Sequence, residues 1–141
     1  MKDQLTDEYR PSEDEPYMCP QHLEFFRQKL LQWRRQLMQE SQGTLERMRE
    51  EKTREADMVD QGLLEADLAF NLKSRERCRN LLVKVDSALV RIEEGTYGYC
   101  EETGEEIGLR RLVASPLATL SIEAQERLER LMKQQGVQER R

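Results

Sequence analysis

The chain has 141 residues, of which 36% are charged and 37% are hydrophobic. An average globular domain has roughly 25% charged residues, and a composition this polar excludes one large round core. It suits a long two-helix hairpin, because the buried seam of such a hairpin is narrow.

The net charge of −5 is unevenly distributed. Residues 1–16 hold six acids and two bases, and residues 50–67 hold seven acids and two bases. No basic block favours non-specific binding to nucleic acid. The first 16 residues lack the apolar core of a signal peptide, and no run approaches the ~20 apolar residues of a membrane span. Three widely separated cysteines do not suggest disulfides. We therefore expect a cytoplasmic protein with no membrane partner.

Residues 1–18 are acidic and contain two prolines, so we expect a flexible, loosely attached segment. A helix is predicted over about residues 22–54, with Pro20 suited to its first turn. Its apolar residues step by three and four, which is a heptad seam. The seam residues are Leu23, Phe26, Leu30, Trp33 and Leu37.

A second helix is predicted over about residues 63–94. Its seam consists of Cys78, Leu82, Val85, Leu89 and Ile92, preceded by Leu64, Leu68 and Leu72. The short link between the two helices favours an antiparallel pair. Residues 19–95 would thus form a coiled-coil hairpin whose acidic tip lies at about residues 55–62.

Residues 96–125 contain glycine-marked turns, and residues 121–136 are expected to form a C-terminal helix. The predicted fold class is mainly all-α. A long antiparallel hairpin would stand on a small globular base, made of a degenerate zinc-finger-like knuckle and the C-terminal helix.

The knuckle is defined by four positions with the spacing of a four-cysteine zinc site, CxxC-x17-CxxC. These positions hold Cys100, Thr103, Ser121 and Ala124. Two hydroxyls and a methyl group cannot replace zinc thiolates, so we expect no zinc and no other metal cofactor. The hydroxyls of Thr103 and Ser121 are expected to accept turn N–H groups, while Cys100 and Ala124 fill space as small buried groups.

Residues 98–112 and 116–124 resemble the finger of the DksA/TraR family. Residues 57–60 are similar to its DxxD hairpin tip, and residues 22–35 to its first helix. The resemblance is collinear over roughly residues 17–135. Because it lacks zinc ligands, the chain is most similar to the zinc-independent paralogues of DksA. It implies a monomeric, non-enzymatic factor that binds bacterial RNA polymerase through the secondary channel and does not bind DNA directly. It also implies control of initiation at ribosomal RNA and amino-acid promoters in the stringent response, with ppGpp as a possible co-effector.

The resemblance also assigns residues. Asp57 and Asp60 would face the polymerase active site, and Gly62 stands where the family usually has alanine, which loosens the start of the second helix. The ppGpp-related positions are Lys84, Ser115 and Gln125. Ser115 replaces a common arginine and Gln125 a common lysine, so we expect weaker synergy with ppGpp, because charge-assisted phosphate contacts are the strong ones.

Other functions stay open. A Gre-type factor that stimulates transcript cleavage also carries an acidic coiled-coil tip, and a structural adaptor would need only the coiled coil. In that second case the two aspartates form a solvated hairpin end. A zinc-ribbon DNA reader and an enzyme are disfavoured by the missing ligands and the lack of a nucleophile–base pair. His22 is expected at the surface or in a cap, Cys19 as a loop thiol, and Cys100 as a buried thiol rather than a redox switch.

Overall fold

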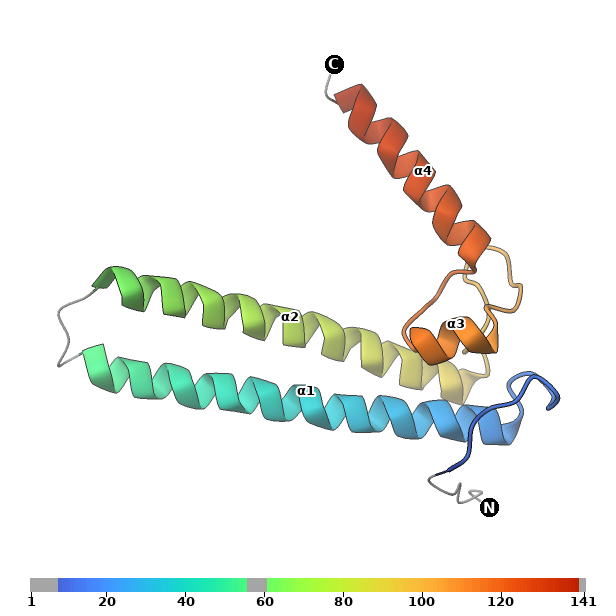
Figure 1. Cartoon of the computed structure of the whole chain (residues 1–141), viewed down its shortest axis with the longest axis horizontal. Helices are drawn as coiled ribbons and strands as arrows, with labels where there is room; N and C mark the ends of the chain where they lie inside the picture. Colours follow the sequence, from blue (N-terminus) through green and yellow to red (C-terminus); the bar gives the residue numbers. More distant parts are fainter. Residues whose placement is uncertain (1–7, 56–60, 140–141) are drawn as a thin grey trace. The chain divides into compact units, whose positions relative to one another are not determined.

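The computed structural model describes the backbone of residues 8–55 and 61–139, and the side chains of residues 8–50 and 65–136. The elements in chain order are α1 (Pro20–Glu55), α2 (Gln61–Glu94), α3 (Leu109–Ala114) and α4 (Ile122–Glu139) (Figure 1). Among the described residues, β pairing is limited to one bridge between Tyr99 and Glu106. The predicted mainly all-α fold class is confirmed.

The described residues fall into two compact units. One unit, here called the hairpin unit, consists of residues 29–89 and holds most of α1 and α2. The other, the base unit, combines the residues up to 28 with those from 90 onward. None of the described helices has both the length and the apolar character that crossing a bilayer requires.

Within the hairpin unit, α1 and α2 run antiparallel and side by side (Figure 1). The Arg34 guanidinium pairs with Asp86 at 2.8 Å, and the Arg77 guanidinium pairs with Glu40, also at 2.8 Å. As the numbering rises along α1, the partners on α2 fall in number, which is the mark of an antiparallel pair. The predicted hairpin is therefore confirmed. Both ion pairs are exposed, so each contributes only about 0.2–1 kcal/mol of stability.

The seam between these helices keeps a strict seven-residue spacing on both sides. The buried positions on α1 are Leu30, Leu37 and Thr44, and those on α2 are Asn71, Cys78 and Val85, with Ala88 beside them. Thr44 and Asn71 are only 0% and 4% exposed. Thr44 stays buried because its hydroxyl donates to the Glu40 carbonyl at 3.0 Å and accepts from the Arg47 guanidinium at 3.1 Å.

The predicted lead-in to the α2 seam is wrong. Leu68 and Leu72 are 42% and 50% exposed, while Asn71 takes the buried position between them. The heptad register runs back from Cys78 by seven residues to the polar Asn71, and the leucines on either side of Asn71 lie outside this register. Leucines in this part of α2 therefore lie on the surface.

The base unit has its own core, in which Phe26 of α1 contacts Tyr97 with ring centroids 5.5 Å apart. Ile107, Leu109 and Leu112 are also buried there. The two leucines belong to α3, a six-residue helix that was not predicted. Six residues are too few to show a helical period, and only tertiary packing makes so short a helix stable.

Residues 8–18 are also packed, which corrects the expectation of a loosely attached segment in its described part. The Tyr17 hydroxyl donates to the Gly98 carbonyl at 2.6 Å and accepts the Gly108 N–H at 3.0 Å. The ring of Tyr9 makes an edge contact with Phe25 at 6.2 Å between centroids. Aromatic residues among the acids therefore anchor this segment to the base unit.

Candidate functional site

The four knuckle positions lie within the base unit, and three of them are buried. Cys100, Ser121 and Ala124 are buried, while Thr103 is exposed. The Ala124 N–H donates to Ser121 Oγ at 3.2 Å, and the Glu105 N–H donates to Thr103 Oγ1 at 3.3 Å. Both hydroxyls thus accept turn N–H groups, as predicted. Ser121 acts as the N-cap of α4, since its carbonyl also accepts the Gln125 N–H at 2.9 Å.

Cys100 is the one retained thiol of the four positions, and hydrogen bonds converge on its sulfur. The Thr103 hydroxyl and then the Ser121 N–H lower the pKa of the Cys100 thiol to about 6, although burial acts in the opposite direction. The N–H groups of Thr103 and Glu102 add to the lowering. These interactions favour the charged form of the Cys100 side chain, against the effect of burial.

These four positions do not fit a zinc ion. Zinc in a structural site takes four thiolate, imidazole or carboxylate ligands. Here one position offers a thiolate, two offer hydroxyls that already bond backbone N–H groups, and Ala124 offers only a methyl group. In this chain the loop is closed by hydrogen bonds and by burial of small side chains.

A tyrosine holds the two halves of the knuckle together. Tyr97 is 1% exposed, and its hydroxyl donates to the Pro116 carbonyl at 2.8 Å. Burial raises the pKa of Tyr97, so the phenol stays protonated and remains a donor. Nearby, Gly98 has a φ of +90°, and a Cβ atom there would lie 2.8 Å from the sulfur of Met18. The positive φ favours glycine at this position, and any larger residue would also have to displace the flexible Met18 side chain.

The tip aspartates, Asp57 and Asp60, lie outside the described residues. Gly62 lies in the first turn of α2, which begins at Gln61. Among the described residues, α1 ends at Glu55 and α2 begins at Gln61. The roles of Asp57, Asp60 and Gly62 stay predictions.

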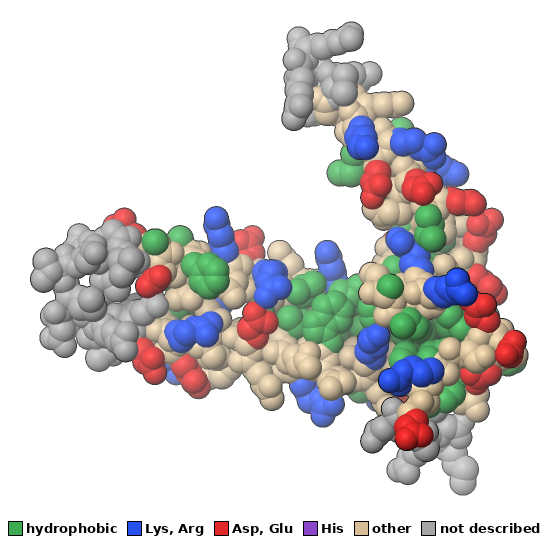
Figure 2. All heavy atoms as spheres, in the orientation of Figure 1, with side chains coloured by type: hydrophobic (Ala, Val, Ile, Leu, Met, Phe, Trp, Pro, Cys, Tyr) green, Lys and Arg blue, Asp and Glu red, His purple; other side chains and the backbone are tan. Residues whose placement is uncertain are grey.

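The three ppGpp-related positions are divided between the two units. Lys84 is an exposed residue of α2 in the hairpin unit. Ser115 is exposed at the end of α3, and Gln125 lies half-buried in the first turn of α4. The Gln125 side chain donates to Glu129 at 3.2 Å. Along α4, acidic and basic side chains are intermixed on the visible face (Figure 2).

His22 corrects another expectation. It was expected at the surface or in a cap, but it is 0% exposed in the first turn of α1. Cys19 directly precedes α1, where its carbonyl accepts the Leu23 N–H at 3.1 Å, and its side chain is half-buried. Sequence reasoning missed that these two residues lie together near Glu15. The one signal for this was the spacing of Cys19 and His22, three residues apart at a helix start.

Two family models match the chain in consecutive order. The N-terminal domain of DnaK suppressor protein DksA matches residues 22–92. The prokaryotic dksA/traR C4-type zinc finger matches residues 95–130, which include all four knuckle positions. The chain thus matches a C4 zinc-finger family over a region where three of the four cysteine ligands are replaced by other residues.

Individual proteins give the same result. The RNA polymerase-binding transcription factor DksA of Caulobacter vibrioides (strain NA1000 / CB15N) is 53% identical over 123 residues, which cover 87% of each chain. The protein of the same name from Escherichia coli (strain K12) is 38% identical over 115 residues, covering 82% of this chain and 76% of its own. The solved structure of transcription factor DksA2 from Pseudomonas aeruginosa matches with a TM-score of 0.74 and 38% identity, over 88% of this chain and 94% of that one.

Proposed function

The chain belongs to the DksA/TraR family, and from this membership we propose that it is a non-enzymatic regulator that binds bacterial RNA polymerase. The observation that carries the proposal is the unbroken order of the two family matches, over residues 22–92 and 95–130. The antiparallel α1–α2 pair supplies a long arm of the kind that the mechanism needs. Binding to polymerase also implies a cytoplasmic location.

In the proposed mechanism, the hairpin enters the secondary channel and brings Asp57 and Asp60 toward the catalytic centre. Carboxylates at that point can interact with basic side chains, backbone N–H groups or a magnesium ion. Such contacts would alter the stability of the open complex at ribosomal RNA and amino-acid promoters. The factor would act as a monomer and without direct recognition of DNA sequence.

The proposed function does not require zinc in the knuckle. The hydrogen bonds of Ser121 and Thr103 and the buried Tyr97 take over the part that a metal has in a C4 finger. A structural zinc can contribute ~10 kcal/mol or more to folding, so a chain without one needs such replacements. This proposal fits a factor that remains active when zinc is scarce.

Synergy with ppGpp is proposed to be weak. Of the three related positions only Lys84 is a cation, and Ser115 and Gln125 are neutral. Each missing cation removes a charge-assisted contact to phosphate. The double variant Ser115→Arg with Gln125→Lys should therefore strengthen the response to ppGpp, and Lys84→Ala should weaken it. Lys73→Ala, at another exposed lysine of α2, is the matched control.

Two assays with purified polymerase test the proposal. A binding assay should show saturable association of the chain with polymerase core enzyme. A cleavage assay on backtracked complexes should show no stimulation of RNA hydrolysis. Stimulated cleavage would favour a Gre-type factor, and no association at all would favour a structural adaptor.

A further inference from the structure

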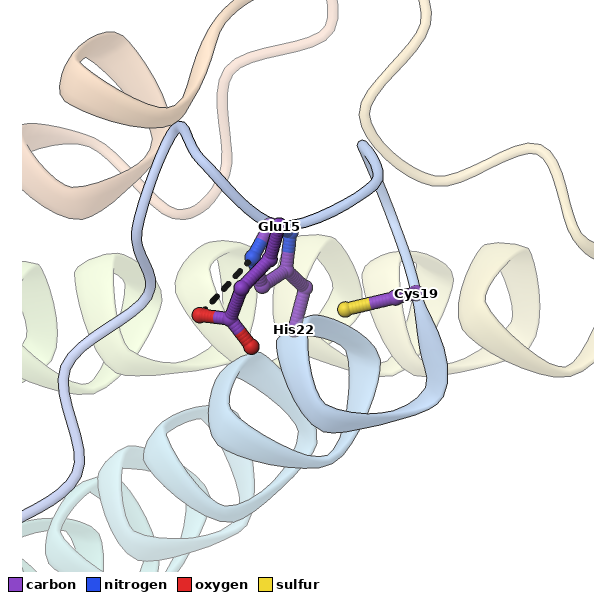
Figure 3. Close-up of side chains that lie close together, drawn as sticks. All are labelled: Glu15, Cys19 and His22. Atoms are coloured by element: carbon purple, nitrogen blue, oxygen red, sulfur yellow. Dashed lines mark ion pairs between the residues drawn. The ribbon is translucent and has the colours of Figure 1, made fainter.

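Glu15, Cys19 and His22 form a side-chain cluster at the start of α1, outside the knuckle. One donor atom from each residue lies within 4.8 Å of the others. Glu15 comes from the segment that precedes α1, and the other two come from the helix start (Figure 3). All three residues belong to the base unit, and none is a knuckle position.

The strongest evidence that this cluster binds a ligand comes from the imidazole of His22. It is 0% exposed, and neither Nδ1 nor Nε2 has a hydrogen-bond partner among the described residues. Its Nε2 lies 3.7 Å from Glu15 Oε1, which is too far for a hydrogen bond. Buried polar nitrogens nearly always have a partner, so a group with none points to something that this chain binds.

The surroundings of Glu15 are those of a carboxylate prepared as a ligand. The Tyr9 hydroxyl lies 2.9 Å from both carboxylate oxygens, and the Ser12 N–H donates to Oε1 at 3.1 Å. Metal ligands are typically oriented by such outer hydrogen bonds. Cys19 Sγ points toward His22 in Figure 3, and its thiol donates to the Gln21 side-chain oxygen at 3.6 Å, a bond that would be lost when the thiol gives up its proton to bind a metal.

We propose that Glu15, Cys19 and His22 bind a divalent transition-metal ion, with Zn²⁺ the best match. One carboxylate, one thiolate and one imidazole are all zinc ligands, whereas Mg²⁺ and Ca²⁺ require oxygen ligands. Metal–ligand bonds of 2.0–2.3 Å place tetrahedral ligands about 3.3–3.7 Å apart, so donor atoms that lie within 4.8 Å of one another would have to approach by up to about 1.5 Å on binding. Cys19 would release its proton to solvent on binding, and a fourth position would stay open to water.

The consequence of binding would be local. The metal would join the segment before α1 to the first turn of that helix, because Glu15 lies on one and His22 on the other. An ion pair between a protonated His22 and Glu15 is the alternative. Either arrangement satisfies one ring nitrogen of His22 and leaves the other without a partner, so what separates them is Cys19, which binds the metal but has no role in the ion pair.

Cobalt titration tests the site, since Co²⁺ replaces Zn²⁺ and shows a charge-transfer absorption band when a thiolate binds it. The full chain is stripped of metal and kept reduced. The wild type and Cys100→Ala should both show the band, and Zn²⁺ should displace it. Cys19→Ser should abolish it, and Glu15→Gln should weaken the affinity at least tenfold. Tyr9→Phe should weaken the affinity by about tenfold, as loss of an outer hydrogen bond does.

The outcomes separate this site from the knuckle. A band that survives Cys19→Ser, or disappears in Cys100→Ala, would overturn the proposal, as would a wild type without any band. As a second measurement, Zn²⁺ should increase the protection of residues 8–18 from protease in the wild type and not in Cys19→Ser. Neither measurement involves polymerase, so neither depends on the proposed function.

Discussion

The Ala124 N–H donates to the Ser121 hydroxyl at 3.2 Å, so two positions that a C4 finger uses for zinc are joined to each other directly. The same bond caps the N-terminus of α4. A position that holds a zinc ligand in a C4 finger thus holds a helix cap in this chain. This relationship explains how the loop can keep its shape after losing metal ligands.

The contribution of the Ser121 cap to stability can be measured by substitution. Ser121→Ala should lower the free energy of unfolding by about 0.5–2 kcal/mol, because the first turn of α4 loses the partner of an N–H group. Ser115→Ala is the matched control, since Ser115 is exposed, and it should change stability by less than about 0.5 kcal/mol. Denaturant unfolding followed by circular dichroism gives both values. Equal effects of the two changes would contradict the capping role.

Restoring the missing ligands tests the knuckle as a former zinc site. The triple variant Thr103→Cys, Ser121→Cys and Ala124→Cys should bind zinc in a tetrahedral site, with Cys100 as the fourth ligand. Adding Cys100→Ala to the triple variant should lower the affinity for zinc. The wild type should keep its helical circular dichroism signal in a chelator, since hydrogen bonds already close the loop. Loss of helix from the wild type on chelation would contradict this account.

Tyr97→Phe should destabilise the base unit by about 1–3 kcal/mol, because the buried Pro116 carbonyl loses its donor. The effect depends on pH. Burial raises the pKa of Tyr97 above that of the unfolded chain, which is about 10. The stabilising effect of the phenol is therefore complete below pH 10 and is lost as the pH rises toward the folded pKa.

The measurement is the difference in unfolding free energy between the wild type and Tyr97→Phe from pH 7 to above pH 10. The difference should be constant up to about pH 10 and then shrink. Tyr99→Phe is the control, because Tyr99 is 37% exposed. A difference that grows with pH would show that the sign of the pKa shift is wrong.

The hairpin unit should depend on its seam and not on its ion pairs. Leu30→Ala should cost about 2–5 kcal/mol, because Leu30 is fully buried. Arg77→Ala should cost at most about 1 kcal/mol, since its pair with Glu40 is exposed to solvent. Thermal unfolding of both variants tests this ranking. A larger loss for Arg77→Ala would contradict it.

The sequence predicted the hairpin well, because the heptad spacing of Leu30, Leu37, Cys78 and Val85 reports burial directly. It failed at Asn71, where a polar residue continues the seam and the neighbouring leucines lie outside. Periodicity in apolar residues cannot show a buried amide. The helix bounds differed by only a few residues, since α1 begins at Pro20 and α2 at Gln61.

In the knuckle, the spacing predicted the four positions and the use of both hydroxyls as acceptors. The lowered pKa of Cys100 could not be predicted, because it depends on the folded loop directing the Thr103 hydroxyl, and then the Ser121 N–H, at the sulfur. The Glu15–Cys19–His22 cluster was also missed. Its carboxylate comes from a segment that was expected to be loose, and the contacts of Tyr9 and Tyr17 that hold this segment against the base unit could not be predicted from the sequence pattern.

The most direct test of the central claim is transcription from a ribosomal RNA promoter by purified polymerase, with the wild type and with Asp57→Asn plus Asp60→Asn. Asp67→Asn, an exposed acid of α2, serves as the charge control. We predict that the wild type and the control lower the transcript yield. The double variant should still bind polymerase but should have lost most of its effect. An unchanged effect of the double variant would contradict the claim that the hairpin tip acts on the polymerase.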